Sequence, residues 1–184
     1  MPSKSPSEKL VYWDSDVILN YLDPNTDPSI ILTLETLLDC SDNKSLPFRI
    51  ITSTLTIAEV AFSAKEKLDF KEDPADWAAI QRIWNDGAVH LVEFYRQIAE
   101  EARGIVRDSR FKQYALKPKD SIHAATAKLL EVDEMHTFDK DLLACSGKFG
   151  FTIAHPNLLL APRALRTIGG PPPPGESTAA TAGE

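Results

Sequence analysis

Segments typical of membrane-bound or secreted proteins are missing from this sequence of 184 residues. No apolar stretch approaches the roughly 20 residues that a membrane-spanning helix needs, so we expect no membrane partner. The N-terminus is polar and no apolar run follows it, so we expect no secretory signal. These absences predict a cytoplasmic protein.

Cysteine is scarce as well. The two cysteines, Cys40 and Cys145, are far apart in the sequence, and neither has His or Cys neighbours at the spacing of a zinc site. A disulfide is disfavoured in a reducing compartment, so we expect buried or idle thiols. The sequence therefore gives no indication of a structural zinc.

Positive charge is in deficit, because 20 Lys and Arg residues stand against 27 Asp and Glu residues, for a net charge of −7. This balance argues against a general nucleic-acid coat protein, which is usually basic. It does not exclude a nuclease, because a catalytic cluster of carboxylates itself adds negative charge. The segment 103–119 runs against the trend, with Asp108 as its one acidic residue and six basic ones: Arg103, Arg107, Arg110, Lys112, Lys117 and Lys119.

The length suits one domain, and a hydrophobic content of 43% is enough for a buried core. No internal repeat is present. We expect residues 1–9 to be an N-terminal extension and residues 10–160 to be the folded domain. Residues 161–184 are rich in Pro, Gly, Ala and Thr and have almost nothing to bury, which predicts a disordered tail.

Short apolar runs alternate with amphipathic stretches along the folded part. Strands that alternate with helices imply a parallel sheet covered on both faces. We therefore predict an α/β protein, a three-layer α/β/α sandwich around a mostly parallel five-stranded sheet. The pattern predicts strands over 10–13, 48–51, 89–94, 134–138 and 151–154, and helices over 17–22, 29–40, 53–67, 74–85, 95–114 and 118–131.

Four acidic residues fall where strands end or helices begin. Asp14 follows the first strand, and Asp139 ends the fourth. Glu59 is in the opening turns of the helix after the second strand, and Asp120 is in the first turn of the helix that Pro118 opens. Ligands of open α/β sheets bind at the carboxyl edge of the strands, so we expect all four acids at that edge.

Such a cluster of carboxylates is tolerable only with protons or cations between its members. Two charges about 5 Å apart at an effective dielectric of about 20 repel by roughly 3 kcal/mol. Mg²⁺ and Mn²⁺ prefer oxygen ligands, commonly one or two carboxylates with water and phosphate. The acids therefore predict a magnesium or manganese site.

Each acid also has a simpler interpretation. Asp14 could cap the helix that follows it, Asp120 could complement the dipole of its helix, and Asp139 could be a turn residue. Glu59 is harder to explain in this way, because a charge on a largely apolar face needs a partner. The convergence of all four at one edge favours a functional cluster.

Four segments, in this order, resemble the motifs of toxin-type PIN-domain ribonucleases. Residues 11–19 (VYWDSDVIL) resemble the opening motif, a hydrophobic strand followed by Asp, then Thr or Ser, then Asn or Ser. Residues 53–60 (STLTIAEV) resemble the second motif, whose Glu is an active-site acid. Residues 120–127 (DSIHAATA) and 137–142 (TFDKDL) resemble the third and fourth. The resemblance covers about residues 10 to 156.

The resemblance implies a PIN-like sandwich that cuts RNA, often forms a homodimer and is often held inactive by an antitoxin protein. It carries over four catalytic acids, Asp14, Glu59, Asp120 and Asp139, of which all except Glu59 are implied as direct metal ligands. Other positions are implied to support the site: Ser15, Asp16, Thr137, Asp141 and His123. One departure is Asp16, because the family usually has Asn or Ser there.

We predict the hydrolysis of a phosphodiester with one or two metal ions, which would bind phosphate oxygens, activate a water and stabilise the leaving 3′ oxygen. The basic segment ends beside Asp120 and could hold flanking phosphates, although charges on a long helix often form only a solvated face. The candidate RNA contacts are Arg107, Arg110, Lys117 and Lys119.

Two alternatives stay open. Residues 14–17 also resemble the opening motif of haloacid-dehalogenase-like phosphatases, but that interpretation lacks a catalytic lysine and leaves Glu59 and Asp120 unexplained. The other alternative is a PIN fold without activity that serves as a binding module. The presence of all four acids counts against it.

Overall fold

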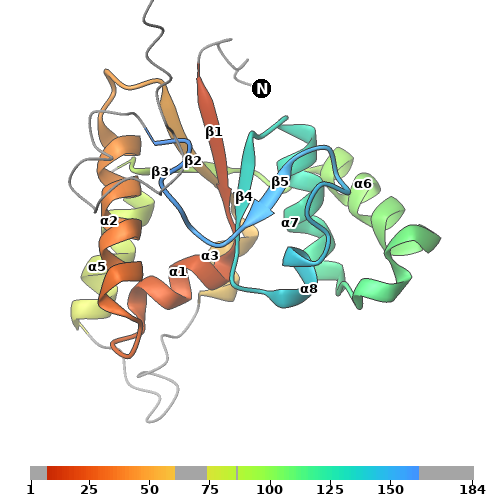
Figure 1. Ribbon diagram of the computed structural model, residues 1–184, viewed down its shortest axis with the longest axis horizontal. Helices are drawn as coiled ribbons and strands as arrows, with labels where there is room; N and C mark the ends of the chain where they lie inside the picture. Colours follow the sequence, from red (N-terminus) through yellow and green to blue (C-terminus); the bar gives the residue numbers. More distant parts are fainter. Residues whose placement is uncertain (1–7, 61–73, 86, 162–184) are drawn as a thin grey trace, which may run out of the picture.

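Five parallel strands form the centre of the protein, in the order β3-β2-β1-β4-β5. The computed structural model describes residues 8–60, 74–85 and 87–161. Helices α1, α2 and α5 cover one side of the sheet, and α6 and α7 cover the other (Figure 1). This arrangement confirms the predicted α/β/α sandwich. The strands are β1 (Lys9–Trp13), β2 (Phe48–Ser53), β3 (Val89–Val92), β4 (Glu134–His136) and β5 (Thr152–Ala154).

The central strand β1 separates two hydrophobic cores. Side chains alternate across a strand, so Val11 and Trp13 lie in the core beneath α1 and α2, and Tyr12 lies in the opposite core beneath α6 and α7. All three are fully buried. The helices are α1 (Ser15–Leu22), α2 (Pro28–Asp42), α3 (Leu55–Glu59), α5 (Pro74–Asn85), α6 (Arg96–Arg107), α7 (Pro118–Leu129) and α8 (Lys140–Leu143).

The direction of winding reverses next to β1. The chain adds β2 and β3 on one side of β1, then returns to place β4 and β5 on the other side. In open α/β sheets, the carboxyl ends of the strands at such a reversal form the binding crevice. The ends of β1 and β4 are therefore the position where the fold favours a ligand site.

Several predicted boundaries are wrong. The helix expected over 95–114 ends at Arg107, because the Asp108 carboxylate accepts from the amide of Arg110 and starts a separate 3₁₀ helix, Ser109–Tyr114. The strands expected to reach 94 and 138 end at Val92 and His136. The helix α7 ends at Leu129, two residues before Glu131, whose φ of 51° is left-handed.

Some predictions fall wholly or partly outside the described residues. These are almost all of the tail predicted over 161–184, the second half of the helix predicted over 53–67, and most of the extension over 1–9. Two bounds are wrong by one residue, because Ala161 is buried in the core and Lys9 belongs to β1. Both cysteines are free and buried. None of the helices in the described parts of the chain is long and apolar enough to cross a membrane.

Candidate active site

Asp14 stands at the carboxyl end of β1 and caps helix α1. Its Oδ1 accepts hydrogen bonds from the amide of Ser15 at 2.6 Å and from the Ser15 hydroxyl at 3.2 Å. Its Oδ2 accepts from the hydroxyl of Thr137 at 2.8 Å. Thr137 follows β4, so this hydrogen bond joins the ends of two adjacent strands. Ser15 and Thr137, which the sequence predicted to support the site, therefore both contact Asp14.

Asp139 is held from the same threonine. The Thr137 hydroxyl accepts from the amide of Asp139 at 2.9 Å. The Oδ1 of Asp139 then caps α8 by accepting from the amides of Asp141 at 2.7 Å and Leu142 at 3.2 Å. Its Oδ2 has no hydrogen bond to any residue that the structure describes. Asp139 therefore keeps one carboxylate oxygen available to a ligand.

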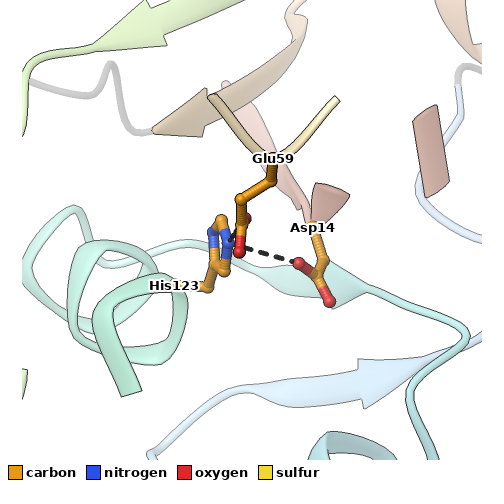
Figure 2. Close-up of side chains that lie close together, drawn as sticks. All are labelled: Asp14, Glu59 and His123. Carbon is orange, nitrogen blue, oxygen red and sulfur yellow. Dashed lines mark hydrogen bonds and ion pairs between the residues drawn. The ribbon is translucent and has the colours of Figure 1, made fainter. Parts of the chain in front are cut away.

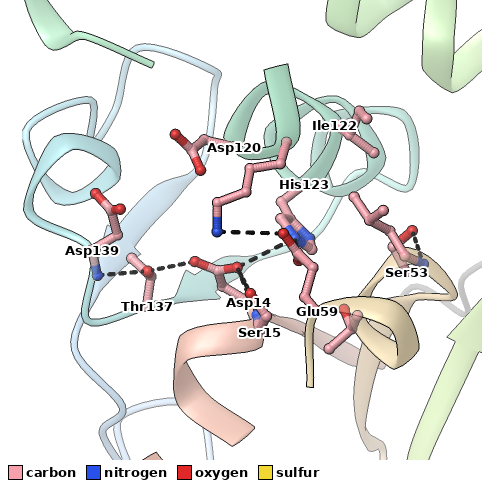
Figure 3. A network of polar contacts seen from close by, with 12 residues as sticks. Asp14, Ser15, Ser53, Glu59, Asp120, Ile122, His123, Thr137 and Asp139 are labelled. Carbon is pink, nitrogen blue, oxygen red and sulfur yellow. Dashed lines mark hydrogen bonds and ion pairs between the residues drawn. The ribbon is translucent and has the colours of Figure 1, made fainter. Parts of the chain in front are cut away.

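Asp120 lies in the first turn of α7, buried at the same edge. Its Oδ2 accepts from the amide of Lys117 at 2.8 Å, and its Oδ1 has no partner within the described ranges. Burial raises the pKa of Asp120, and the charges of Asp139 and Asp14 raise it further, against the hydrogen bond from Lys117. Figure 3 shows Asp120 and Asp139 pointing into the same space beside Asp14.

Glu59, His123 and Asp14 make the tightest cluster of the site (Figure 2). The Nε2 of His123 lies 2.6 Å from Oε2 of Glu59 and 3.4 Å from Oδ1 of Asp14. Ligand atoms of these three residues lie within 4.8 Å of one another, a grouping that could hold a metal ion. Asp120 and Asp139 stand outside that grouping. The structure thus brings the four predicted acids to one edge, but in two subsets.

The charges in this cluster determine its protonation. Burial by itself would raise the pKa of Glu59, but the hydrogen bond and charge of His123, with Lys119, lower it to about 2. Glu59 is therefore an ionised acceptor. Burial would lower the pKa of His123, whereas the hydrogen bond to Glu59 and the charge of Asp14 raise it. At 2.6 Å from a carboxylate oxygen, Nε2 must carry a hydrogen whether the ring is neutral or charged.

Tyr12 belongs to this site, although the sequence did not single it out. Its hydroxyl lies 2.7 Å from Nδ1 of His123 and accepts from the amide of Ser53 at 3.2 Å. Burial raises the pKa of Tyr12, so the phenol stays neutral. A buried tyrosine hydroxyl in a central strand needs a polar partner, and this requirement was the signal that could have pointed to it.

Two predicted supports do not contact the acids through their side chains. Asp16 is half-buried on α1, and its carboxylate has no hydrogen bond or ion pair with a described residue. Burial raises its pKa, and the charge of Asp14 adds to the effect. Asp141 contacts Asp139 only through its backbone amide.

The four predicted RNA contacts differ in whether their charge is already paired with an acidic residue. The guanidinium of Arg110 donates two hydrogen bonds to Asp108, at 2.9 and 2.6 Å, so its charge is already paired. The ammonium of Lys119 lies 3.4 Å from Oε1 of Glu59. Arg107 and Lys117 are exposed, and neither forms an ion pair with any described residue. Arg107 lines a groove of about 410 Å³ between α6 and the start of α7.

Residues 11–147 match the PIN domain family. The chain belongs to the PIN-domain family. Its motifs and its acidic edge are therefore those of a family of nucleases, and membership sets aside the haloacid-dehalogenase interpretation. No curated protein matches the sequence.

Several solved structures share the fold of this chain at low sequence identity. The structure of FitAcB from Neisseria gonorrhoeae is 16% identical with a TM-score of 0.55, over 79% of this chain and 97% of that one. VapBC2 from Rickettsia felis, bound to a promoter DNA fragment, is 10% identical with a TM-score of 0.56, over 80% and 99%. VapC20 from Mycobacterium tuberculosis, described as a toxin that cleaves the sarcin-ricin loop, is 18% identical with a TM-score of 0.54, over 79% and 99%.

Proposed function

We propose that this PIN-domain protein is a metal-dependent ribonuclease that hydrolyses RNA phosphodiester bonds. The observation that carries the proposal is the acidic edge, where Asp14, Asp120 and Asp139 surround one space and two of them keep an oxygen without a partner among the described residues. Family membership supports nuclease chemistry, and the description of VapC20 as an RNA-loop-cleaving toxin makes RNA the first substrate to test.

The donor set fits magnesium or manganese. Asp14, Asp120 and Asp139 offer only carboxylate oxygens, which suit hard divalent cations. Burial raises the pKa of Asp120, and the charges of Asp139 and Asp14 add to this effect, so a bound cation would stabilise the ionised carboxylate. When bound, a divalent ion would polarise the phosphate and lower the pKa of the attacking water.

The remaining residues act by holding these carboxylates in place. Ser15 and Thr137 donate to Asp14, so both of its oxygens are oriented before any ligand arrives. The amides of Asp141 and Leu142 orient Asp139 in the same manner. Such outer hydrogen bonds typically contribute 10- to 100-fold to metal affinity or activity.

RNA would approach along the side of α6 that faces the start of α7. The groove there is lined by Phe94, Arg103, Arg107 and Pro118, and Pro118 opens the helix that carries Asp120. Aromatic rings stack on bases, and arginines contact phosphates, so this lining suits a single strand next to the cut. Lys117 extends the same positive surface, whereas Arg110, paired with Asp108, does not.

We further propose an antitoxin partner and a homodimer. The support for an antitoxin is the likeness of the fold to FitAcB and VapBC2, and the support for a homodimer is the family resemblance. Light scattering of the purified protein should give twice the 20.4 kDa mass of one chain. A mass of one chain would contradict the homodimer without affecting the nuclease proposal.

The decisive test is cleavage of a mixed RNA pool with Mn²⁺, by the wild type and by Asp120→Asn. We expect cleavage by the wild type that EDTA abolishes, and at least 100-fold less by the variant. Equal cleavage by both proteins would refute the role of Asp120. A wild type that binds Mn²⁺ but cuts neither RNA nor DNA would favour the alternative of an inactive binding module.

A further inference from the structure

Both oxygens of Glu59 are engaged by basic side chains, whereas those of Asp14 accept from Ser15 and the hydroxyl of Thr137. Oε2 accepts from Nε2 of His123 at 2.6 Å, and Oε1 faces the ammonium of Lys119 at 3.4 Å. Asp120 and Asp139 each keep one oxygen without a partner among the described residues. The contacts of Glu59 therefore suit the anchoring of a positive charge better than the binding of a metal ion.

His123 cannot replace Glu59 as a metal ligand. Its Nε2 carries the hydrogen that it donates to Glu59, so it has no lone pair to offer in this arrangement. Its Nδ1 faces the hydroxyl of Tyr12, which in turn accepts from the amide of Ser53. This chain of contacts runs from the backbone of β2 to the Glu59 carboxylate, and Tyr12 and His123 are both almost completely buried. These contacts hold the carboxylate of Glu59 in position.

At the outer end of this chain is Lys119. It is the second residue of α7, a position where the helix dipole disfavours a cation. The dipole penalty is offset by the acids, since Glu59, Asp120 and Asp14 hold the pKa of Lys119 above its ordinary value despite partial burial. Among the described residues, no other lysine or arginine forms an ion pair with the four acids.

We propose that Lys119 is a catalytic residue whose ammonium, anchored by Glu59, donates to a non-bridging oxygen of the scissile phosphate. This inference rests on the proposed nuclease function. In the reaction, a water oxygen bonds to phosphorus and releases a proton to solvent, the bond from phosphorus to the 3′ oxygen breaks, and a proton from solvent completes the 3′ hydroxyl. Lys119 stays protonated throughout. It supplies the positive charge that a second metal ion would otherwise supply, and Tyr12 and His123 are positioning residues.

Lys119→Met is the first test, because it removes the charge and keeps much of the apolar stem. We expect kcat for RNA cleavage to fall at least 100-fold, the effect of losing one preorganised charge at a transition state. The dissociation constant for Mn²⁺, from calorimetry without RNA, should stay the same or become a few-fold smaller, because a competing cation is gone. Lys119→Arg should keep part of the activity.

A matched control is available on the same helix. Lys128 has the same side-chain exposure, 46% against 47% for Lys119, and is also paired with a glutamate, Glu101. Because Lys128 lies at the far end of α7, Lys128→Met should cleave at the wild-type rate. A rise in KM for Lys119→Met with kcat unchanged would reduce Lys119 to a phosphate-binding surface charge and overturn the proposal.

Glu59→Gln tests the anchor. We expect kcat to fall about as far as in Lys119→Met, with Mn²⁺ affinity within about 3-fold of the wild type, and the double variant should be no slower than either single variant. Asp120→Asn, in contrast, should weaken Mn²⁺ binding at least 10-fold. Equal weakening by Glu59→Gln and Asp120→Asn would make Glu59 a metal ligand and overturn the inference. If the wild type cleaves no RNA at all, the proposed function fails instead.

Discussion

The contact between Glu59 and His123 gives the protein a dependence of stability on pH that a single substitution should remove. Glu59 is only 14% exposed, and its pKa lies at about 2 instead of the ordinary 4.5. Each pH unit corresponds to about 1.4 kcal/mol, so ionised Glu59 stabilises the metal-free fold by up to about 3 kcal/mol at neutral pH. Glu59→Gln keeps the shape of the side chain and loses most of this stabilisation.

The direction of the effect follows from the lowered pKa. Stability from Glu59 is fully present above the unfolded pKa of 4.5 and is lost as the pH falls toward 2. Relative to pH 7, the wild type should lose about 1 kcal/mol from this group at pH 4 and about 2 kcal/mol at pH 3. His123 acts in the opposite direction, because its raised pKa makes its contribution decline as the pH rises above 6.5. The comparison should therefore run from pH 7 downward.

The assay is equilibrium unfolding in urea with EDTA present, followed by the fluorescence of tryptophan, since Trp13 is fully buried. Glu59→Gln should be less stable than the wild type at pH 7, and the difference should shrink by about 2 kcal/mol between pH 7 and pH 3. Glu35→Gln, on the exposed face of α2, is the control and should change stability by less than about 0.5 kcal/mol. A difference between Glu59→Gln and wild type that is constant with pH would refute the reasoning.

Three further predictions concern the surroundings of the site. Thr137→Val removes a donor to Asp14 and an acceptor for the Asp139 amide, so the free energy of unfolding should fall by about 1–3 kcal/mol. Calorimetry should show Mn²⁺ binding weakened about 10-fold or more. Arg107→Ala should reduce the slope of log RNA affinity against log salt concentration by about one phosphate contact, whereas Arg110→Ala should leave this slope unchanged. Equal slopes for the two variants in filter binding would contradict the assigned RNA surface. Gly87→Ala should lower the free energy of unfolding by about 1 kcal/mol or more, because Gly87 has a φ of 83°, and unchanged thermal unfolding would count against this.

Much of this fold was predictable because its signals are local. The apolar runs around Tyr12 and Ile50 predict buried strands, and Pro118 predicts the start of α7 at the residue where it begins. Boundaries failed where a side chain competed with the helix, as Asp108 does when it caps the 3₁₀ helix. That Asp108 and Arg110 are two residues apart means that this break could have been anticipated from the sequence.

The sequence by itself determined that the four acids reach one edge of the sheet, since parallel strands end together. Three of the acids lie at a strand end or a helix start, and Glu59 ends the short helix α3 that follows β2. Only the tertiary structure decided which of them keep open oxygens and which are engaged. Tyr12 meets His123 across 111 residues, and His123 meets Glu59 across 64. Such partners depend on how helices pack against the sheet to within an ångström, and no local periodicity encodes that distance. The pairing of Lys119 with Glu59 likewise depends on the tertiary structure.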